Sequence, residues 1–242
     1  MGRLTSLLGW RAAAAGALAV ALALYYRFHD SLPNTSTWGD VAALSLLVIP
    51  AVFFLVYLAL PLRRSPPVQL ALVAAAFGVL ALFFQLAGLG ALASFAKLAA
   101  MTAVAFAFLD FFENAYWVVL VALIVPWVDA YSVWRGPTSN IVEHHGHVFT
   151  ALSFSFPLPG EDDAARLGLP DLLFLGLFLA AAARFRLRVF WTWVCLVASF
   201  GATFALAILT DQAGLPALPL LSLGFLLPNA DLLWRRWRAG RT

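Results

Sequence analysis

The chain has 242 residues, of which 63% are hydrophobic and 11% are charged, and its formal net charge is +3. The mean hydropathy of +0.91 excludes a soluble globular domain, because a domain of this size could not bury so much apolar surface. The single cysteine, Cys195, excludes an internal disulfide. We therefore interpret the chain as a multi-pass membrane protein that has lipid as its main surroundings.

Hydropathy divides the chain into eight apolar segments, each near the length of about 20 residues that a membrane-spanning helix needs. The segments cover residues 10–27, 40–62, 68–89, 92–112, 115–134, 167–185, 189–209 and 215–234. We interpret the first as a retained anchor, because Tyr25-Tyr26-Arg27 is a poor signal-peptide cleavage context. Lys97, near the start of the fourth, is expected to extend to the membrane interface. The sequence thus predicts an all-α, polytopic transmembrane helical bundle of about eight helices, in a single domain over residues 1–242.

The basic residues predict the orientation of this bundle. If the N-terminus is cytoplasmic, the inner side holds eleven of them and the outer side four. The inner residues are Arg3, Arg11, Arg63, Arg64, Arg184, Arg186, Arg188, Arg235, Arg236, Arg238 and Arg241, and the outer ones are Arg27, Lys97, Arg135 and Arg166. This asymmetry follows the positive-inside rule. We therefore expect both termini in the cytoplasm and the protein in the cell (inner or plasma) membrane.

Two aspartates, Asp129 and Asp171, lie inside the apolar segments 115–134 and 167–185. A carboxylate in hydrocarbon costs about 2.5–3.5 kcal/mol on insertion scales, so it is rarely found there without a use. In the predicted topology both carboxyl groups lie roughly 6–8 Å inside the outer boundary. The string Pro216-Ala217-Leu218 opens the last segment at the same level. Three features that are far apart in sequence are therefore expected at one depth.

This order of motifs resembles the presenilin and signal peptide peptidase family of intramembrane aspartyl proteases. That family carries one aspartate in a Tyr-Asp pair, a second in Gly-x-Gly-Asp on the next helix, and Pro-Ala-Leu at the start of its last helix. Asp129 stands at the first position, Gly168-Leu169-Pro170-Asp171 at the second and Pro216-Ala217-Leu218 at the third. The resemblance covers residues 117–234, about half of the chain. The expected cytoplasmic C-terminus is the orientation of signal peptide peptidases.

The resemblance implies catalytic roles for Asp129 and Asp171, in core helices over residues 115–234 that follow N-terminal helices in 1–114. It implies substrate contacts from the residues around these motifs, which are Gly168, Leu169, Pro170, Pro216, Ala217 and Leu218. The implied partners are transmembrane helices or signal-peptide remnants. The chain departs from the family in three ways. Val128 replaces the tyrosine, Pro170 replaces the second glycine, and eight segments replace nine.

Two carboxyl groups a few ångströms apart cannot both ionise cheaply, so they share a proton. The ionised partner can activate a water, while the neutral partner donates a proton to the scissile carbonyl oxygen. We expect this chemistry to need no cofactor. An unwound substrate needs backbone partners. An extended stretch beside Pro216-Ala217-Leu218, or the run from Ala151 to Phe156 with its alternating Phe and Ser residues, could pair with the substrate as an added strand.

Two other functions are compatible with intramembrane aspartates. A proton-coupled transporter could use Asp129 and Asp171 as proton sites, and a catalytically inactive relative could bind membrane helices without cutting them. The separation of the two carboxyl groups distinguishes these functions. A short distance favours a protease, and a long distance along a continuous polar channel favours a transporter.

Two other strings have simpler explanations. Glu143-His144-His145-Gly146-His147 contains zinc-ligand residue types, but it lies in a loop without a second ligand cluster, so we expect a surface loop and no metal site. The basic run Arg235-Arg236-Trp237-Arg238 is more typical of an inner-face anchor for anionic lipid than of a nucleic-acid-binding patch. We therefore expect lipid, and no nucleic acid, as a partner of this end.

Overall fold

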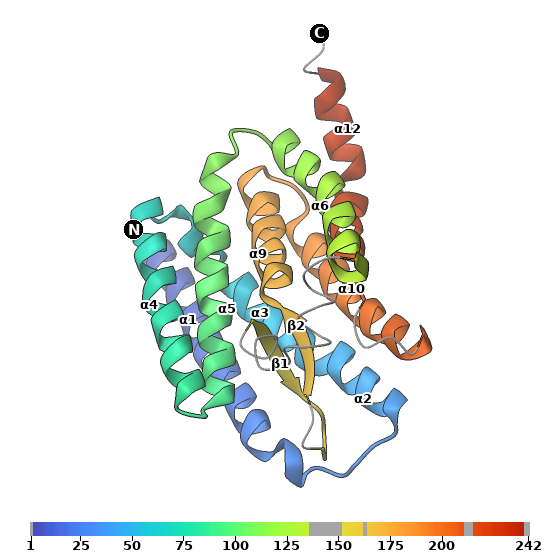
Figure 1. Cartoon of the computed structure of the whole chain (residues 1–242). Coiled ribbons are helices and arrows are strands. Elements are labelled where there is room, and N and C mark those ends of the chain that lie inside the picture. Colours follow the sequence, from blue (N-terminus) through green and yellow to red (C-terminus); the bar gives the residue numbers. More distant parts are fainter. Residues whose placement is uncertain (1, 136–151, 162–163, 211–214, 240–242) are drawn as a thin grey trace.

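The computed structural model of the protein describes residues 2–135, 152–161, 164–210 and 215–239 (Figure 1). The helices in these ranges are α1 (Gly2–Phe28), α2 (Thr37–Ala43), α3 (Ile49–Ala59), α4 (Pro67–Leu86), α5 (Gly90–Phe108), α6 (Ala115–Arg135), α9 (Leu169–Arg184), α10 (Val189–Thr210), α11 (Leu218–Leu226) and α12 (Ala230–Ala239). Short turns of 3-10 or π helix lie at η1 (His29–Ser31), η2 (Leu44–Val48), η3 (Leu60–Arg64), η4 (Leu109–Phe111) and η5 (Leu227–Asn229). The strands are β1 (Ser153–Pro157) and β2 (Ala164–Gly168).

Each of the eight predicted segments is largely helical, which confirms the predicted all-α bundle. Six helical stretches in the described ranges are long and apolar enough to cross a membrane. They are Gly9–Ser31, Thr37–Arg64, Pro67–Leu86, Gly90–Phe111, Ala115–Val133 and Val189–Thr210. The other two predicted segments give shorter helices. The 16 residues of α9 extend for about 24 Å, and η5 separates α11 from α12 at Pro228. The chain is therefore a multi-pass membrane protein.

Helix α9 lies in the middle of the bundle, between α5 on one side and α6 and α10 on the other (Figure 1). Its side chains from Leu175 to Ala182 are all buried. The packing against α5 is tight at Gly176, where an added Cβ would lie only 2.9 Å from the Cβ of Ala105. Small residues at such contacts let helix backbones approach closely in a membrane.

The two strands form an antiparallel hairpin in which Ser153 pairs with Gly168 and Pro157 with Ala164. The alternation in this part of the chain correctly predicts β1, in which Phe154 and Phe156 are fully buried. The prediction that a helix begins at residue 167 is wrong by two residues, because Leu167 and Gly168 belong to β2. Gly168 has extended backbone angles, and a helix begins readily after it because Pro170 has a suitable φ for a first helical turn.

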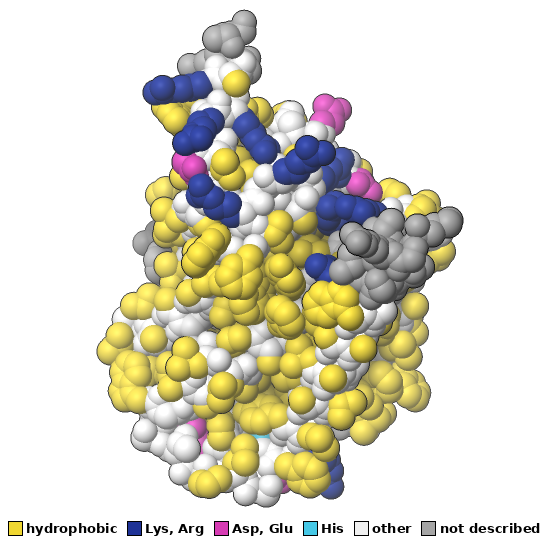
Figure 2. Space-filling model, turned by 180° about the vertical axis from the view of Figure 1, so that it is seen from behind, with side chains coloured by type: hydrophobic (Ala, Val, Ile, Leu, Met, Phe, Trp, Pro, Cys, Tyr) yellow, Lys and Arg dark blue, Asp and Glu magenta, His cyan; other side chains and the backbone are white. Residues whose placement is uncertain are grey.

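Arginine side chains gather at one end of the bundle. Figure 2 shows this end at the top, above a broad hydrophobic surface. Arg184 forms an ion pair with Asp110 at 2.9 Å, and Arg188 forms one with Asp231 at 2.8 Å. Arg63 donates to the carbonyl oxygen of Ala183. The turns that follow α3, α5 and α9 therefore meet at this end, as the predicted alternation of loops requires.

The expected position of Lys97 is wrong. Its ammonium group does not end in solvent, as an interfacial position requires, because the residue is buried within the protein, with an exposed fraction of 7%. The ammonium group finds its partners inside the protein, where it donates to the side chain of Gln85 and to the backbone of Ser153. The hydropathy pattern cannot show such partners, because they come from α4 and from β1.

Candidate active site at three helix ends

Asp129 lies near the C-terminal end of α6 and is partly buried. Its Oδ2 atom accepts a hydrogen bond of 3.0 Å from the backbone N–H of Leu218. Leu218 is the first residue of α11, so its N–H has no acceptor within that helix. Asp129 therefore caps α11 from a neighbouring helix, and the positive end of the α11 dipole favours its negative charge. Two of the three predicted motifs are joined by this bond.

Pro126 lies one turn before Asp129, inside α6. A proline has no N–H, so the carbonyl of Ala122 loses its usual helical partner. Val128, which stands where the resembled family has tyrosine, is 60% exposed. Its side chain therefore lies at the surface of α6 and not in the packed interior.

Asp171 lies in the first turn of α9, directly after β2. The backbone of Gly168, the N-cap residue, hydrogen-bonds to its carboxylate. This is half of a capping box, in which the third helical residue bonds back to the N-cap. A Cβ added at Gly168 would lie 3.2 Å from Asp171 Oδ2. The glycine thus lets the backbone and the carboxyl group come close together.

The two aspartates lie on neighbouring helices, Asp129 near the C-terminal end of α6 and Asp171 in the first turn of α9. Helix α6 contacts both α9 and α11, and α11 also contacts α9. The fold therefore joins Asp129 to Leu218 and packs the helix that carries Asp171 against both of their helices.

The remaining predicted site residues flank these three. Leu169 donates its N–H to the carbonyl of Leu152, which ties the start of α9 to the strand β1. Pro170 is exposed and is available to a ligand. Pro216 is half-buried, and Ala217 is the buried N-cap of α11. Gly168 to Pro170 therefore lie at the junction of β2 and α9, and Pro216 to Leu218 lie at the start of α11.

Sequence reasoning missed the side chains that hold β1 in place. Tyr25 and Tyr26 on α1, and Ser94 and Lys97 on α5, all form hydrogen bonds with the backbone of this strand. The sequence contains a signal for these contacts. Tyr25 and Tyr26 lie near the end of the first apolar segment, and Ser94 and Lys97 are spaced to share one face of the fourth. Residues of the N-terminal helices therefore support the segment that carries Asp171.

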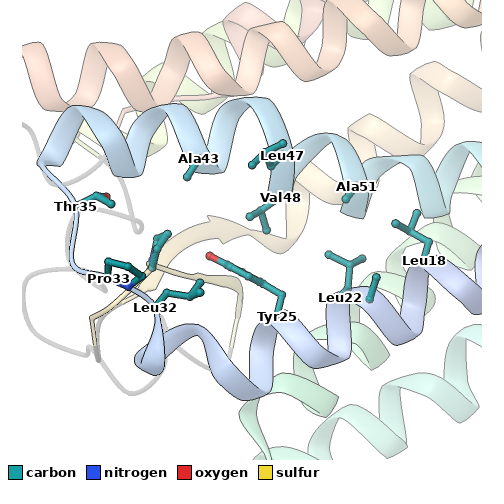
Figure 3. A pocket seen from close by; sticks show the side chains of 12 residues that line it. Leu18, Leu22, Tyr25, Leu32, Pro33, Thr35, Ala43, Leu47, Val48 and Ala51 are labelled. Atoms are coloured by element: carbon teal, nitrogen blue, oxygen red, sulfur yellow. The ribbon is translucent and has the colours of Figure 1, made fainter.

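A cavity of about 460 Å³ lies elsewhere, between α1, the start of the α2–α3 stretch and the hairpin turn (Figure 3). Its lining is almost entirely apolar and includes Leu18, Leu22 and Val48, with Tyr25 at one side. Neither Asp129 nor Asp171 lines it. Its lining contains no carboxyl, histidine or cysteine side chain, so we look for hydrolytic chemistry at the aspartates.

Within the described ranges, no group of three or more His, Cys, Asp or Glu residues could hold a metal ion. The string from Glu143 to His147 lies outside the described residues. The sequence matches no family model, and no curated protein matches it.

Proposed function

We propose that this protein is an intramembrane aspartyl protease, related to presenilins and signal peptide peptidases, which hydrolyses peptide bonds in membrane-spanning segments or signal-peptide remnants. The observation that carries the proposal is the hydrogen bond from Leu218 to Asp129, on two helices that both contact α9. It joins two of the three motifs on which the family resemblance rests, and the third, Asp171, lies on α9. The catalytic residues are Asp129 and Asp171, and they act as one unit.

The proposed reaction needs a water between the two carboxyl groups. One carboxyl group is ionised and takes a proton from that water, which attacks the scissile carbonyl carbon. The other is neutral and donates its proton to the carbonyl oxygen. The first carboxyl group then donates its new proton to the amide nitrogen, and the second takes a hydroxyl proton from the tetrahedral intermediate as the C–N bond breaks and the carbonyl re-forms, so the pair returns to its starting state. The bond between Leu218 and Asp129 fixes one carboxylate oxygen and leaves the other oxygen for water.

The hairpin supports a specific mode of substrate binding. One edge of β1 pairs with β2, and its other edge is occupied by side chains from α1 and α5. We therefore place the substrate on β2 and not on β1, as an added strand beside Arg166. Arg166 lies two residues before Gly168 on β2, and Asp171 follows in the first turn of α9. A strand added there would present its backbone carbonyls to the aspartates.

One feature speaks against the transporter alternative. On the inner side of Asp171, every residue from Leu172 to Ala183 is apolar or glycine. The helix α6 likewise has no charged residue between Ala115 and Val128. A proton path across the membrane needs a chain of polar or ionisable groups. Neither aspartate-bearing helix supplies one, whereas a protease needs water only from the nearer side.

The decisive test uses purified protein in bilayers with a fluorogenic membrane-spanning peptide. Asp129→Asn and Asp171→Asn should each abolish cleavage with folding intact, and the double variant should lose no more than either single one. Proton flux into vesicles is measured in parallel. Full cleavage by either variant would exclude the dyad, and aspartate-dependent proton flux without cleavage would favour the transporter.

We also propose that the arginine-rich end faces the cytoplasm of a cell with both termini on that side. The correction for Lys97 leaves eleven inner basic residues against three outer ones. In a Cys195→Ser background, a membrane-impermeant thiol reagent applied outside should label Ser31→Cys and not Glu113→Cys. Both positions are exposed, and they follow α1 and α5, which end at opposite ends of the bundle (Figure 1). The reverse labelling would invert the orientation and leave the pairing of the aspartates unaffected.

A further inference from the structure

The edge of β1 that does not pair with β2 forms hydrogen bonds with side chains from α1 and α5. Tyr26 donates its hydroxyl to the carbonyl of Ser155 at 2.7 Å, and Tyr25 donates to that of Pro157 at 2.7 Å. The Ser155 N–H donates to Ser94 Oγ at 3.4 Å. Figure 3 shows Tyr25 reaching from α1 toward the hairpin. This edge is therefore fixed by α1 and α5, which lie outside the proposed catalytic core.

Lys97 is the charged member of this set. Its Nζ atom lies 3.0 Å from Gln85 Oε1 and 3.0 Å from the carbonyl oxygen of Ser153. The exposed fraction of the residue is 7%. A lysine within a membrane helix costs about 2.5–3.5 kcal/mol on insertion scales, so its presence calls for a use. A structural use would be to join α4 to α5 through Gln85.

The bond to Ser153 leads directly toward the site. Ser153 is the register partner of Gly168, the last residue of β2. Gly168 is also the N-cap of α9, and its backbone hydrogen-bonds to the carboxylate of Asp171. Three consecutive contacts therefore connect the buried ammonium group with Asp171. Gln85 lies on α4 and takes part in none of these three contacts.

We propose that Lys97 is a positioning residue, which fixes β1 so that β2 and the Asp171 carboxyl group keep the geometry needed for hydrolysis. This inference rests on the proposed protease function. An ammonium group suits the task because it has three donors and no acceptor, so it can bond Ser153 and Gln85 at once. Hydrogen bonds from a charged donor are also stronger than neutral ones. The strand carbonyl is thus held more firmly than a serine or an amide would hold it.

The close fit of the hairpin turn supports a fixed strand. The Gly160 N–H donates to the carbonyl of His29 at 2.7 Å. Gly160 has a φ of +75°, and an added Cβ would lie 2.7 Å from the backbone of Asn34. The turn therefore rests on the connection between α1 and α2. Lys97 holds the opposite end of β1, where the strand enters the site.

The test compares Lys97→Met with the matched control Gln85→Met. Both variants break the bond between Lys97 and Gln85, but only the first removes the bond to Ser153. In bilayers with the membrane-spanning peptide, Lys97→Met should lower kcat by about tenfold to a hundredfold with KM changed less than about threefold, because misplaced groups lower turnover. Gln85→Met should retain kcat within about twofold.

The outcomes separate this inference from the proposed function. Asp171→Asn serves as the inactive control. If the unmodified protein is as inactive as this control, the proposed function fails and the inference fails with it. If the unmodified protein cleaves and the two methionine variants lose the same activity, Lys97 only joins two helices and the inference is wrong. Lys97→Gln, which keeps a shorter neutral donor, replaces Lys97→Met if that variant does not fold. An unchanged kcat in Lys97→Gln would also overturn the inference.

Discussion

The helices that carry the two aspartates lie in opposite surroundings. In α6, which carries Asp129, only 11% of the apolar 18-residue stretch that could cross the membrane is buried inside the protein. In α9, which carries Asp171, the side chains from Leu175 to Ala182 are all buried. One carboxyl group thus belongs to the packed centre of the bundle, and the other to a helix that mostly faces lipid. The comparison indicates a fixed half and an adjustable half of the site.

The difference has a use in a protease whose substrate is a membrane helix. A substrate has to reach the aspartates from the lipid, so at least one wall of the site has to give way. Helix α6 has few buried contacts to lose, and regions with few such contacts open most readily. Helix α9 has many, so the Asp171 carboxyl group and β2 keep their places. Asp129 stays aligned through its bond to Leu218.

Replacing each aspartate with glutamate, which is longer by one methylene group, should give the largest difference in kcat between the fixed half and the adjustable half of the site. Asp171→Glu should lower kcat by about a hundredfold or more, because its carboxyl group already lies against the backbone of Gly168 and cannot shift. Asp129→Glu should cost about tenfold, since α6 can move to compensate. Single-turnover cleavage in bilayers measures both rates. Equal losses would show that the two surroundings do not matter for catalysis.

A larger side chain should also lower the thermal stability of the protein more in the tightly packed α9 than at an open position on another helix. Gly176→Val brings side-chain atoms against Ala105 on α5, where an added Cβ would lie only 2.9 Å away. Overpacking of this kind costs about 1–3 kcal/mol. The matched control is Gly78→Val on α4, where nothing lies within 4 Å of an added Cβ. Thermal unfolding in detergent should give a lower Tm for Gly176→Val only. A similar Tm for both variants would contradict a tightly packed α9.

The proline in α6 offers a smaller and more specific change. Pro126→Ala restores the N–H that can bond to the carbonyl of Ala122, and so stiffens the helix before Asp129. If α6 is the adjustable wall, this variant should be more stable and yet cleave about threefold more slowly. Cleavage rate and Tm are measured on the same preparation. A faster and more stable enzyme would exclude a role for flexibility at Pro126.

The sequence predicts most of the bundle because lipid imposes a simple rule on it. A long apolar run in a membrane protein is nearly always a helix, since the backbone has to satisfy its own hydrogen bonds. The same rule fails for Ala164 to Gly168, which has no alternation and no long apolar run, so β2 was not predicted. It also fails for Lys97, whose partners Gln85 and Ser153 come from other elements. Local patterns do not contain such contacts.

The candidate site, too, has features that local sequence patterns predict and contacts that they do not. Asp129, Asp171 and the start of the last helix could be placed at one depth, because topology and helical rise decide depth. The bond from Leu218 to Asp129 could not be predicted, since it depends on the rotation of α6 against α11. The hydrogen bond from the Gly168 backbone to the Asp171 carboxylate is more local and follows from their three-residue spacing. Depth is thus a property of the sequence, whereas orientation is a property of packing.

The smallest expected effect concerns Pro170, which sits between the fixed half of the site and the substrate. Pro170→Gly restores a backbone N–H at an exposed position beside β2, where an added strand could use it. We expect cleavage to rise by about twofold to threefold, the effect of one modest hydrogen bond, and to vanish when Asp171→Asn is added. Because glycine also loosens the first turn of α9, Tm should fall slightly while the rate rises. An unchanged or lower rate in a folded variant would show that the site is adapted to proline, and that the rigidity of the fixed half extends to the residue before Asp171.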